Sequence, residues 1–201
     1  MFSSNKILET REDLESALQR ASRVKVLDIS FPGYDFREYG EELGKLTGLK
    51  ELSIQFNHDY SHKFTLPEEL GELKSLRKLH LLNYFFEEIP QWIFRLGQLE
   101  NLMLRGNDIR EIPSEIAKLV KLKHLRIENT LLESIPDELS RLENLQTLSL
   151  VDNFQLKKFN RRAVGKNLKW LALGASGVPS EEVGQLKSLF PGVKFNKRYF
   201  G

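Results

Sequence analysis

Leucine and isoleucine recur along the chain in one short pattern. Six stretches share the order Leu, two variable residues, Leu, one variable residue, then Leu or Ile: LKELSIQFN, LRKLHLLNY, LENLMLRGN, LKHLRIENT, LQTLSLVDN and LKWLALGAS. Their first leucines are residues 49, 76, 99, 122, 145 and 168, so one step is 27 residues and the next four are 23. Degenerate copies lie at 24–32 and 190–198. Such a period is typical of a chain built from stacked, similar units.

Each unit also has a second half with a different pattern. The segments LPEELGELKSL, IPQWIFRLGQL, IPSEIAKLVKL and IPDELSRLENL place a proline at a helix start and follow it with helix-spaced apolar residues. The pattern therefore predicts a short strand, a turn, a proline-started helical segment and a return in each unit. One unit cannot bury its own leucines, whereas stacked units bury them in a continuous column.

The motif L-x-x-L-x-L-x-x-N-x-L, followed by I-P-x-x-I/L-x-x-L, resembles the leucine-rich repeat family and its short bacterial members with 23-residue repeats. The resemblance implies an α/β fold. We expect a right-handed solenoid, or horseshoe, with a parallel β-sheet on its concave face and short helices or irregular turns on its convex face. We divide the chain into an N-terminal capping helix region (1–23), the solenoid (24–189), and a C-terminal degenerate repeat and cap (190–201).

The expected N-terminal cap is an amphipathic helix that leads into the first strand. Thr10 with Asp13 forms a helix-start signature. The apolar face of this helix would consist of Leu14, Ala17, Leu18 and Ala21. The alternative is an unrelated N-terminal extension.

Numbering each repeat from its first leucine assigns every side chain to a side of the sheet. Positions 1, 4, 6 and 11 should lie in the core, and positions 3, 5 and 7 on the concave face or its rim, because strand residues alternate between faces. Position 9 should lie inside, where an asparagine amide can satisfy backbone groups of the turns. Asn57, Asn107 and Asn153 occupy it. Tyr84, Thr130 and Ser176 replace asparagine, and we expect Tyr84 to turn outward because of its size. We also expect Trp92 on the outer, convex side.

The middle of the concave face carries the side chains that we expect to contact a partner. They form a contiguous basic and apolar patch of Lys78, His80, Leu82, Met103, Arg105, His124 and Arg126, with Phe85, Glu128 and Trp170 beside it. In the last strand we place Gly192 at position 3 and Lys194 at position 5. Arg, Met and Trp are enriched at protein interfaces. Eight strands ~4.8 Å apart make a face of about 38 Å, which suits a protein or peptide better than a small molecule. The alternative is an ordinary solvated surface.

Composition argues against several kinds of chemistry. The chain has no cysteine, and therefore no disulfide, thiolate metal site or cysteine nucleophile. No Gly-rich phosphate loop or Ser/His/Asp arrangement stands out. His58 and His62 are four residues apart, but in an expected loop with no third ligand. We therefore expect a binding protein that is not an enzyme and has no cofactor or metal.

Charge is uneven along a chain whose net charge is only +2. From residue 157 onward there are ten Lys or Arg and two Glu. The densest cluster is Lys157, Lys158, Arg161, Arg162, Lys166 and Lys169. An alternative function is therefore binding of an acidic surface or nucleic acid through this basic C-terminal quarter. Nucleic acid is disfavoured because no stacking aromatic residues are interleaved with the basic ones.

No apolar run is long enough to span a membrane, and the start MFSSNKILETRED lacks the pattern of a signal peptide. We expect a cytoplasmic protein, or a secreted one whose signal has been removed. The partner should be a protein or peptide, and weak homodimerisation through the solenoid ends is an alternative.

Overall fold

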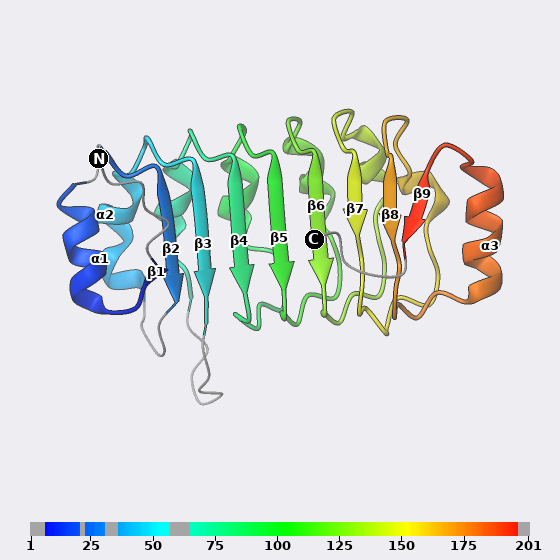
Figure 1. Cartoon of the computed structure of the whole chain (residues 1–201), viewed down its shortest axis with the longest axis horizontal. Helices are drawn as coiled ribbons and strands as arrows, with labels where there is room; N and C mark the ends of the chain where they lie inside the picture. The colour runs from blue at the N-terminus through cyan, green and yellow to red at the C-terminus, as the bar shows by residue number, and fades with distance from the viewer. Residues whose placement is uncertain (1–6, 21–22, 31–35, 57–64, 197–201) are drawn as a thin grey trace.

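The computed structural model describes residues 7–20, 23–30, 36–56 and 65–196. In these residues nine parallel strands form one sheet whose strand order follows the sequence (Figure 1). The strands are β1 (Ile7–Leu8), β2 (Val26–Ser30), β3 (Glu51–Gln55), β4 (Lys78–Leu82), β5 (Asn101–Arg105), β6 (His124–Glu128), β7 (Thr147–Ser149), β8 (Trp170–Ala172) and β9 (Lys194–Asn196). Each strand runs down the face nearest the viewer and each connection returns behind it, so the solenoid is right-handed, as predicted.

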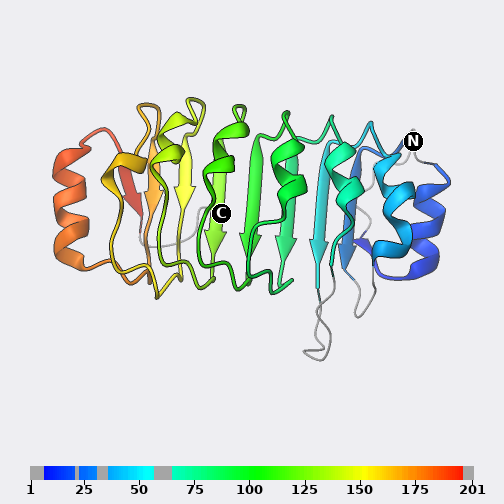
Figure 2. The ribbon, with the colours of Figure 1, turned by 180° about the vertical axis from the view of Figure 1, so that it is seen from behind.

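The connections lie on the opposite side of the sheet (Figure 2). They contain the α-helices α2 (Gly40–Gly44) and α3 (Ser180–Leu189), and the 3₁₀ helices η2 (Phe36–Tyr39), η3 (Glu68–Glu72), η4 (Gln91–Arg95), η5 (Ser114–Lys118), η6 (Asp137–Arg141) and η7 (Arg161–Ala163). A further helix, α1 (Arg11–Leu18), precedes β2, and α1 and α3 lie at the two ends of the array. We call the side of the sheet opposite the 3₁₀ helices the front face.

Proline fixes where the connections of the central repeats begin. The helices η3 to η6 start directly after Pro67, Pro90, Pro113 and Pro136. The proline ring holds φ near −65°, a value that suits entry into a helical turn. Each helix is only five residues long and is followed by a leucine, as when the Leu96 amide donates to the Ile93 carbonyl (3.1 Å). The predicted proline-started segments are therefore present as short 3₁₀ helices.

The leucine positions form one continuous core. In the repeat of β5, Leu99, Leu102 and Leu104 are fully buried, and the equivalent residues of the neighbouring repeats are buried too. The prediction that Trp92 lies on the outside is wrong, because this side chain is only 1% exposed. Carboxylates such as Glu69 occupy the equivalent place after the other prolines and are not buried. The large apolar ring of Trp92 therefore packs inward where a charged group stays at the surface.

Asn107 and Asn153, at position 9, bind their repeats to the ones before them. The Oδ1 atom of Asn107 accepts from the amides of Tyr84 (3.2 Å) and Phe86 (3.3 Å), and Nδ2 donates to the Leu81 carbonyl (3.4 Å). Asn153 does the same two repeats later, because its Oδ1 accepts from the Thr130 amide (3.2 Å) and its Nδ2 donates to the Ile127 carbonyl (2.7 Å). A repeat without its own asparagine is thus satisfied by the next repeat. Asn57 lies outside the described residues.

Tyr84 occupies the asparagine position without leaving the core. The prediction that it turns outward is wrong, because it is only 4% exposed. Its ring stacks on Phe86 (centroids 5.2 Å apart) and lies 5.7 Å from Phe56. Burial raises the pKa of the Tyr84 hydroxyl far above its usual range, so the group stays neutral. Aromatic packing therefore replaces the amide of this repeat.

The two ends of the array differ from the central repeats. At the start, the Thr10 side chain caps α1 by accepting from the Asp13 amide (3.1 Å), and the Leu14 side chain is fully buried. Ala21 lies outside the described residues. Strand β1, which the sequence pattern did not predict, pairs with β2 through Ile7 opposite Asp28.

The last strand has a different register from the predicted one. Trp170 pairs with Lys194, so Lys194 and not Gly192 stands at position 3. The connection before β9 contains the ten-residue helix α3, and Lys194 follows Trp170 by 24 residues, two more than the predicted 22. A shift of two keeps the same side chains on the same face.

The position-9 asparagines give a first testable prediction. Replacing Asn153 with alanine should leave the buried Thr130 amide and Ile127 carbonyl without partners, and should lower the free energy of unfolding by about 3 kcal/mol. Urea unfolding measures this change. Asn144 is the matched control, because its Nδ2 also donates to a backbone carbonyl of the preceding repeat (Val120, 2.8 Å) but is exposed. Equal losses in the two variants would contradict the role of the buried amide.

Candidate functional site

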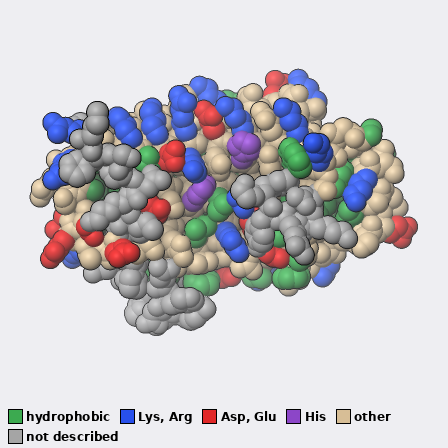
Figure 3. Space-filling model, viewed as in Figure 1, with side chains coloured by type: hydrophobic (Ala, Val, Ile, Leu, Met, Phe, Trp, Pro, Cys, Tyr) green, Lys and Arg blue, Asp and Glu red, His purple; other side chains and the backbone are tan. Residues whose placement is uncertain are grey.

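The strand register brings most of the predicted partner-binding residues together on the front face. Strands β4, β5 and β6 align in three rows: Lys78, Asn101 and His124; His80, Met103 and Arg126; and Leu82, Arg105 and Glu128. We use the name central strip for Lys78, His80, Leu82, Met103, Arg105, His124 and Arg126. Figure 3 shows histidine, basic and apolar side chains mixed over the middle of this face. Most of the strip is half-buried, and Arg105 is exposed.

Glu128 lies in the third row but is fully buried. Its carboxylate accepts from the Arg126 Nε (3.0 Å) and Nη2 (3.4 Å) and from the Ser149 hydroxyl (2.6 Å). The Arg126 side chain is itself only 21% exposed. Glu128 therefore fixes the orientation of Arg126 from beneath, and its own carboxylate is not presented at the surface.

The histidines of the strip are neutral at pH 7. Burial, and secondarily the charge of Lys78, lowers the pKa of His80. Burial also lowers the pKa of His124, whose Nδ1 lies 3.1 Å from the Thr147 hydroxyl. The positive charge of the strip therefore comes from Lys78, Arg105 and Arg126, and that of Lys78 is shared with Glu51 (3.3 Å).

Two buried polar atoms lie among the strands of the strip. They are the Nε2 atom of His80 and the Oδ1 atom of Asn101. A side-chain hydrogen bond with Asn101 acts on His80 and partly offsets the lowering of its pKa by burial. These two side chains therefore satisfy each other within the strip.

Trp170 and Phe85 lie apart from the strip. Trp170 is on β8, two strands beyond β6, and the Lys194 Nζ lies 4.7 Å from its ring centroid in a cation–π contact. The corrected register of β9 brings these two residues together. Phe85 lies beyond the carboxyl end of β4 and has a left-handed backbone (φ 55°). It belongs to a different surface.

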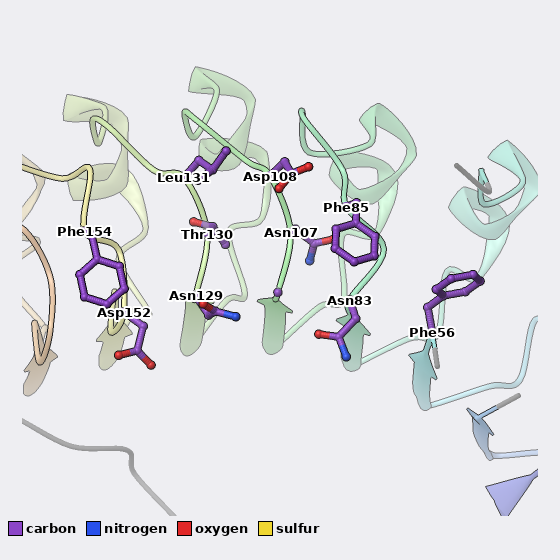
Figure 4. Close-up of a pocket in the computed structure, with 11 residues that line it drawn as sticks. Phe56, Asn83, Phe85, Asn107, Asp108, Asn129, Thr130, Leu131, Asp152 and Phe154 are labelled. Carbon is purple, nitrogen blue, oxygen red and sulfur yellow. The ribbon is translucent and has the colours of Figure 1, made fainter. Parts of the chain in front are cut away.

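That surface is a groove along the carboxyl ends of the strands, with a volume of about 340 Å³ (Figure 4). Its lining includes Asn83, Phe85, Asp108, Leu131, Asp152 and Phe154. We call it the edge groove. Sequence reasoning placed Phe85 beside the patch of the concave face, but did not indicate a groove or its polar residues.

The basic C-terminal cluster is partly neutralised by acids of the preceding repeat. Arg162 pairs with Asp137 (3.5 Å) and Lys166 with Glu143 (3.4 Å). The Lys157 ammonium donates to the Phe154 carbonyl (2.6 Å). The predicted C-terminal cluster is thus less strongly charged than the sequence suggested.

A longer basic surface, which sequence reasoning missed, runs along the other edge of the sheet. Position 2 of successive repeats is basic in five cases, and we call Lys25, Lys50, Arg77, Lys123 and Lys169 the cationic row. Their backbones are hydrogen-bonded in series, as from the Lys50 amide to the Lys25 carbonyl (2.8 Å). Glu100 interrupts the row between Arg77 (3.6 Å) and Lys123 (2.6 Å). Figure 3 shows the resulting line of basic side chains along the upper edge. The basic residue that follows the first leucine in most repeats could have indicated this row in the sequence.

His58 and His62 lie outside the described residues. Within the described residues, no group of three or more His, Asp or Glu side chains is arranged to hold a metal ion. In the same part of the chain, no helix has the length and apolar character needed to cross a membrane.

Comparison with known families agrees with the repeat geometry. Residues 63–172, more than half of the 201-residue chain, match the model of a leucine-rich repeat region. The chain belongs to the leucine-rich repeat family. Leucine-rich repeat domains are a known protein-interaction module. No curated protein matches the sequence.

Solved bacterial leucine-rich repeat structures share the fold. A leucine-rich repeat protein of Leptospira interrogans aligns with a TM-score of 0.62 and 21% identity over 94% of this chain and 57% of the other. The internalin InlF of Listeria monocytogenes gives 0.61 and 15% over 96% and 52%. InlP of the same organism gives 0.54 and 17% over 77% and 43%. This leucine-rich repeat chain thus spans about half the length of these proteins.

The buried Arg126–Glu128 pair gives a second prediction. Replacing Arg126 with methionine should leave a buried carboxylate without its cation, and should lower the free energy of unfolding by about 3 kcal/mol. The double replacement Arg126→Met with Glu128→Leu should restore stability to within about 1 kcal/mol of the original, because an apolar pair avoids the buried charge. Urea unfolding of the three proteins measures both effects. A single variant as stable as the original would show that the pair contributes nothing.

Proposed function

We propose that this leucine-rich repeat protein is a non-catalytic binding module that holds a protein or peptide on its central strip. The observation that carries the proposal is the alignment of apolar and cationic side chains across three adjacent strands. His80, Met103 and Arg126 form the middle of that alignment. Residues of these types supply much of the binding energy of protein interfaces when a partner excludes water from them.

The chemistry of the strip favours a partner that is apolar in part and acidic in part. Leu82 and Met103 provide apolar contact area, while Lys78 and Arg105 provide positive charge. The neutral imidazoles of His80 and His124 can both donate and accept hydrogen bonds.

A test of the strip must avoid Arg126, although it lies at the centre. Reversing its charge would place two acids beside each other, with Glu128 fully buried. Lost binding would then be indistinguishable from lost stability. Lys78 and Arg105 are better targets. Lys78 forms its only ion pair in the described chain with Glu51, and because the Lys78 and Glu51 side chains are both partly exposed, losing that pair should change stability little. Arg105 is exposed.

The third prediction concerns partner capture. The double variant Lys78→Glu with Arg105→Glu should no longer capture the partner from lysate of the source organism. Its affinity for the same partner, once purified, should fall at least tenfold. Affinity capture with mass spectrometry identifies the partner, and calorimetry with the purified partner measures the loss. Thermal unfolding should stay close to that of the original protein.

The matched control reverses the same amount of charge on other surfaces. The double variant Lys118→Glu with Lys187→Glu changes exposed residues of η5 and α3. It should bind the partner as the original protein does. Equal capture by the strip variant and the original would reject the central strip as the binding site.

A second candidate function is binding of an acidic surface or nucleic acid, and the cationic row favours it. Lys25, Lys50 and Lys169 make no ion pair within the described residues. At ~4.8 Å per strand the row is about 29 Å long. The cationic row is therefore a longer basic surface than the C-terminal cluster that first suggested this function.

The fourth prediction tests this candidate with two polyanions, labelled poly-glutamate and a labelled 20-base-pair DNA duplex. Binding should fall steeply as salt is added, because cations released from the polyanion favour association at low salt. The triple charge reversal at Lys25, Lys50 and Lys169 should abolish it. Fluorescence anisotropy measures both. No binding to either probe, or binding insensitive to salt, would reject this function.

A further inference from the structure

The edge groove is produced by a repeated backbone turn. Position 8 is left-handed at Asn83, Gly106, Asn129 and Asp152, with φ of 61°, 67°, 51° and 60°. Asn, Gly and Asp are the residue types that tolerate this conformation best. Each of these amides donates to the position-7 carbonyl of the next repeat, as from Asn83 to Arg105 (2.8 Å) and from Asp152 to Gly174 (2.9 Å). The turn therefore repeats in register along the edge.

This turn separates two rows of side chains. Position 9 enters the core, as Asn107 and Asn153 show, so positions 8 and 10 remain at the edge on either side of it. Figure 4 shows Asn83, Asn129 and Asp152 along one side of the groove. It shows Phe85, Asp108, Leu131 and Phe154 along the other. A polar row thus faces a mainly apolar one.

The groove combines apolar surface with negative charge. Phe154 is 59% exposed, one of three large hydrophobic side chains so exposed within the described residues. Phe85 and Leu131 continue this apolar surface towards β4. Asp108 and Asp152 supply two carboxylates, and none of the eleven described residues that line the groove is Lys, Arg or His. The charge of this described lining is opposite to that of the central strip and the cationic row.

We propose that the edge groove binds an extended peptide segment of a partner protein that carries both basic and apolar side chains. Four consecutive repeats at ~4.8 Å place Phe85 and Phe154 about 14 Å apart, the length of about four extended residues at ~3.4 Å each. Basic side chains pair with Asp108, and apolar ones cover Phe154 and its neighbours. The amides of Asn83 and Asn129 can bond an extended peptide backbone, which offers donors and acceptors along its length.

The groove is a separate site from the central strip. The strip lies on the front face of β4 to β6, whereas the groove lies beyond the carboxyl ends of the strands. The acids of the groove attract a basic ligand, whereas the strip attracts an acidic one. The two sites can therefore be tested independently.

The fifth prediction uses two labelled hexapeptides, RLRFRL and its acidic counterpart ELEFEL. Fluorescence anisotropy should show binding of RLRFRL and at least tenfold weaker binding of ELEFEL. The variant Asp108→Asn with Asp152→Asn removes the charge and keeps a residue that tolerates the left-handed turn. The variant Phe154→Ser removes the exposed ring. Each should weaken RLRFRL binding at least tenfold, with unfolding unchanged.

Matched controls remove the same groups elsewhere. Val120→Ser alters a side chain that is 55% exposed outside the groove, and Glu88→Gln with Glu181→Gln removes two exposed acids. These variants, and the strip variant Lys78→Glu with Arg105→Glu, should bind RLRFRL normally. Equal binding of both peptides, or equal losses in groove and control variants, would overturn the proposal. So would a sedimentation mass that falls on the Phe154→Ser change, because the groove would then be covered by a second copy of the chain.

Discussion

A backbone buried between stacked repeats must find its hydrogen bonds in the neighbouring repeat, and this requirement organises the molecule. It is met at both edges of the sheet in successive repeats, and also inside the molecule in the repeats of Asn107 and Asn153. Position 2 amides bond across the edge where the strands begin, position 8 amides bond across the edge where they end, and the amides of Asn107 and Asn153 bond inside. Because all three bond sets join equivalent positions, they hold every repeat in the same register. Each sequence position therefore becomes a row along the solenoid.

These rows explain how a small chain can present surfaces of different character. Position 2 gives the cationic row, positions 3, 5 and 7 give the central strip, and positions 8 and 10 give the edge groove. The leucines of positions 1, 4 and 6 support all of them, so surface residues can vary with little effect on the core. Charge is therefore separated by position within the repeat rather than by distance along the chain. The division into an acidic and a basic part of the sequence conceals this arrangement.

The sequence predicted those features of the fold that depend on periodicity. The leucine spacing gave the parallel sheet, the core and the register of β2 to β8, because a repeat of fixed length permits one alignment. It missed β1, since Ile7 and Leu8 are too short a run to show any period. It misplaced β9, because α3 adds residues to the last connection. Its errors at Tyr84 and Trp92 have a common cause, which is that side-chain size alone does not show whether neighbouring repeats leave room for a ring.

The sequence also predicted where the central strip lies, but not how its members are bound. Arg126 and Glu128 are two residues apart on one strand, so alternation correctly placed them on the same face. Alternation cannot show that Ser149 of the next strand also bonds to Glu128, or that Glu128 is buried completely. This burial makes Arg126 part of the scaffold as well as part of the strip. Arg105, which lies beside Glu128 on β5, is exposed. The proposed binding surface therefore combines residues that hold its shape with residues whose side chains are exposed.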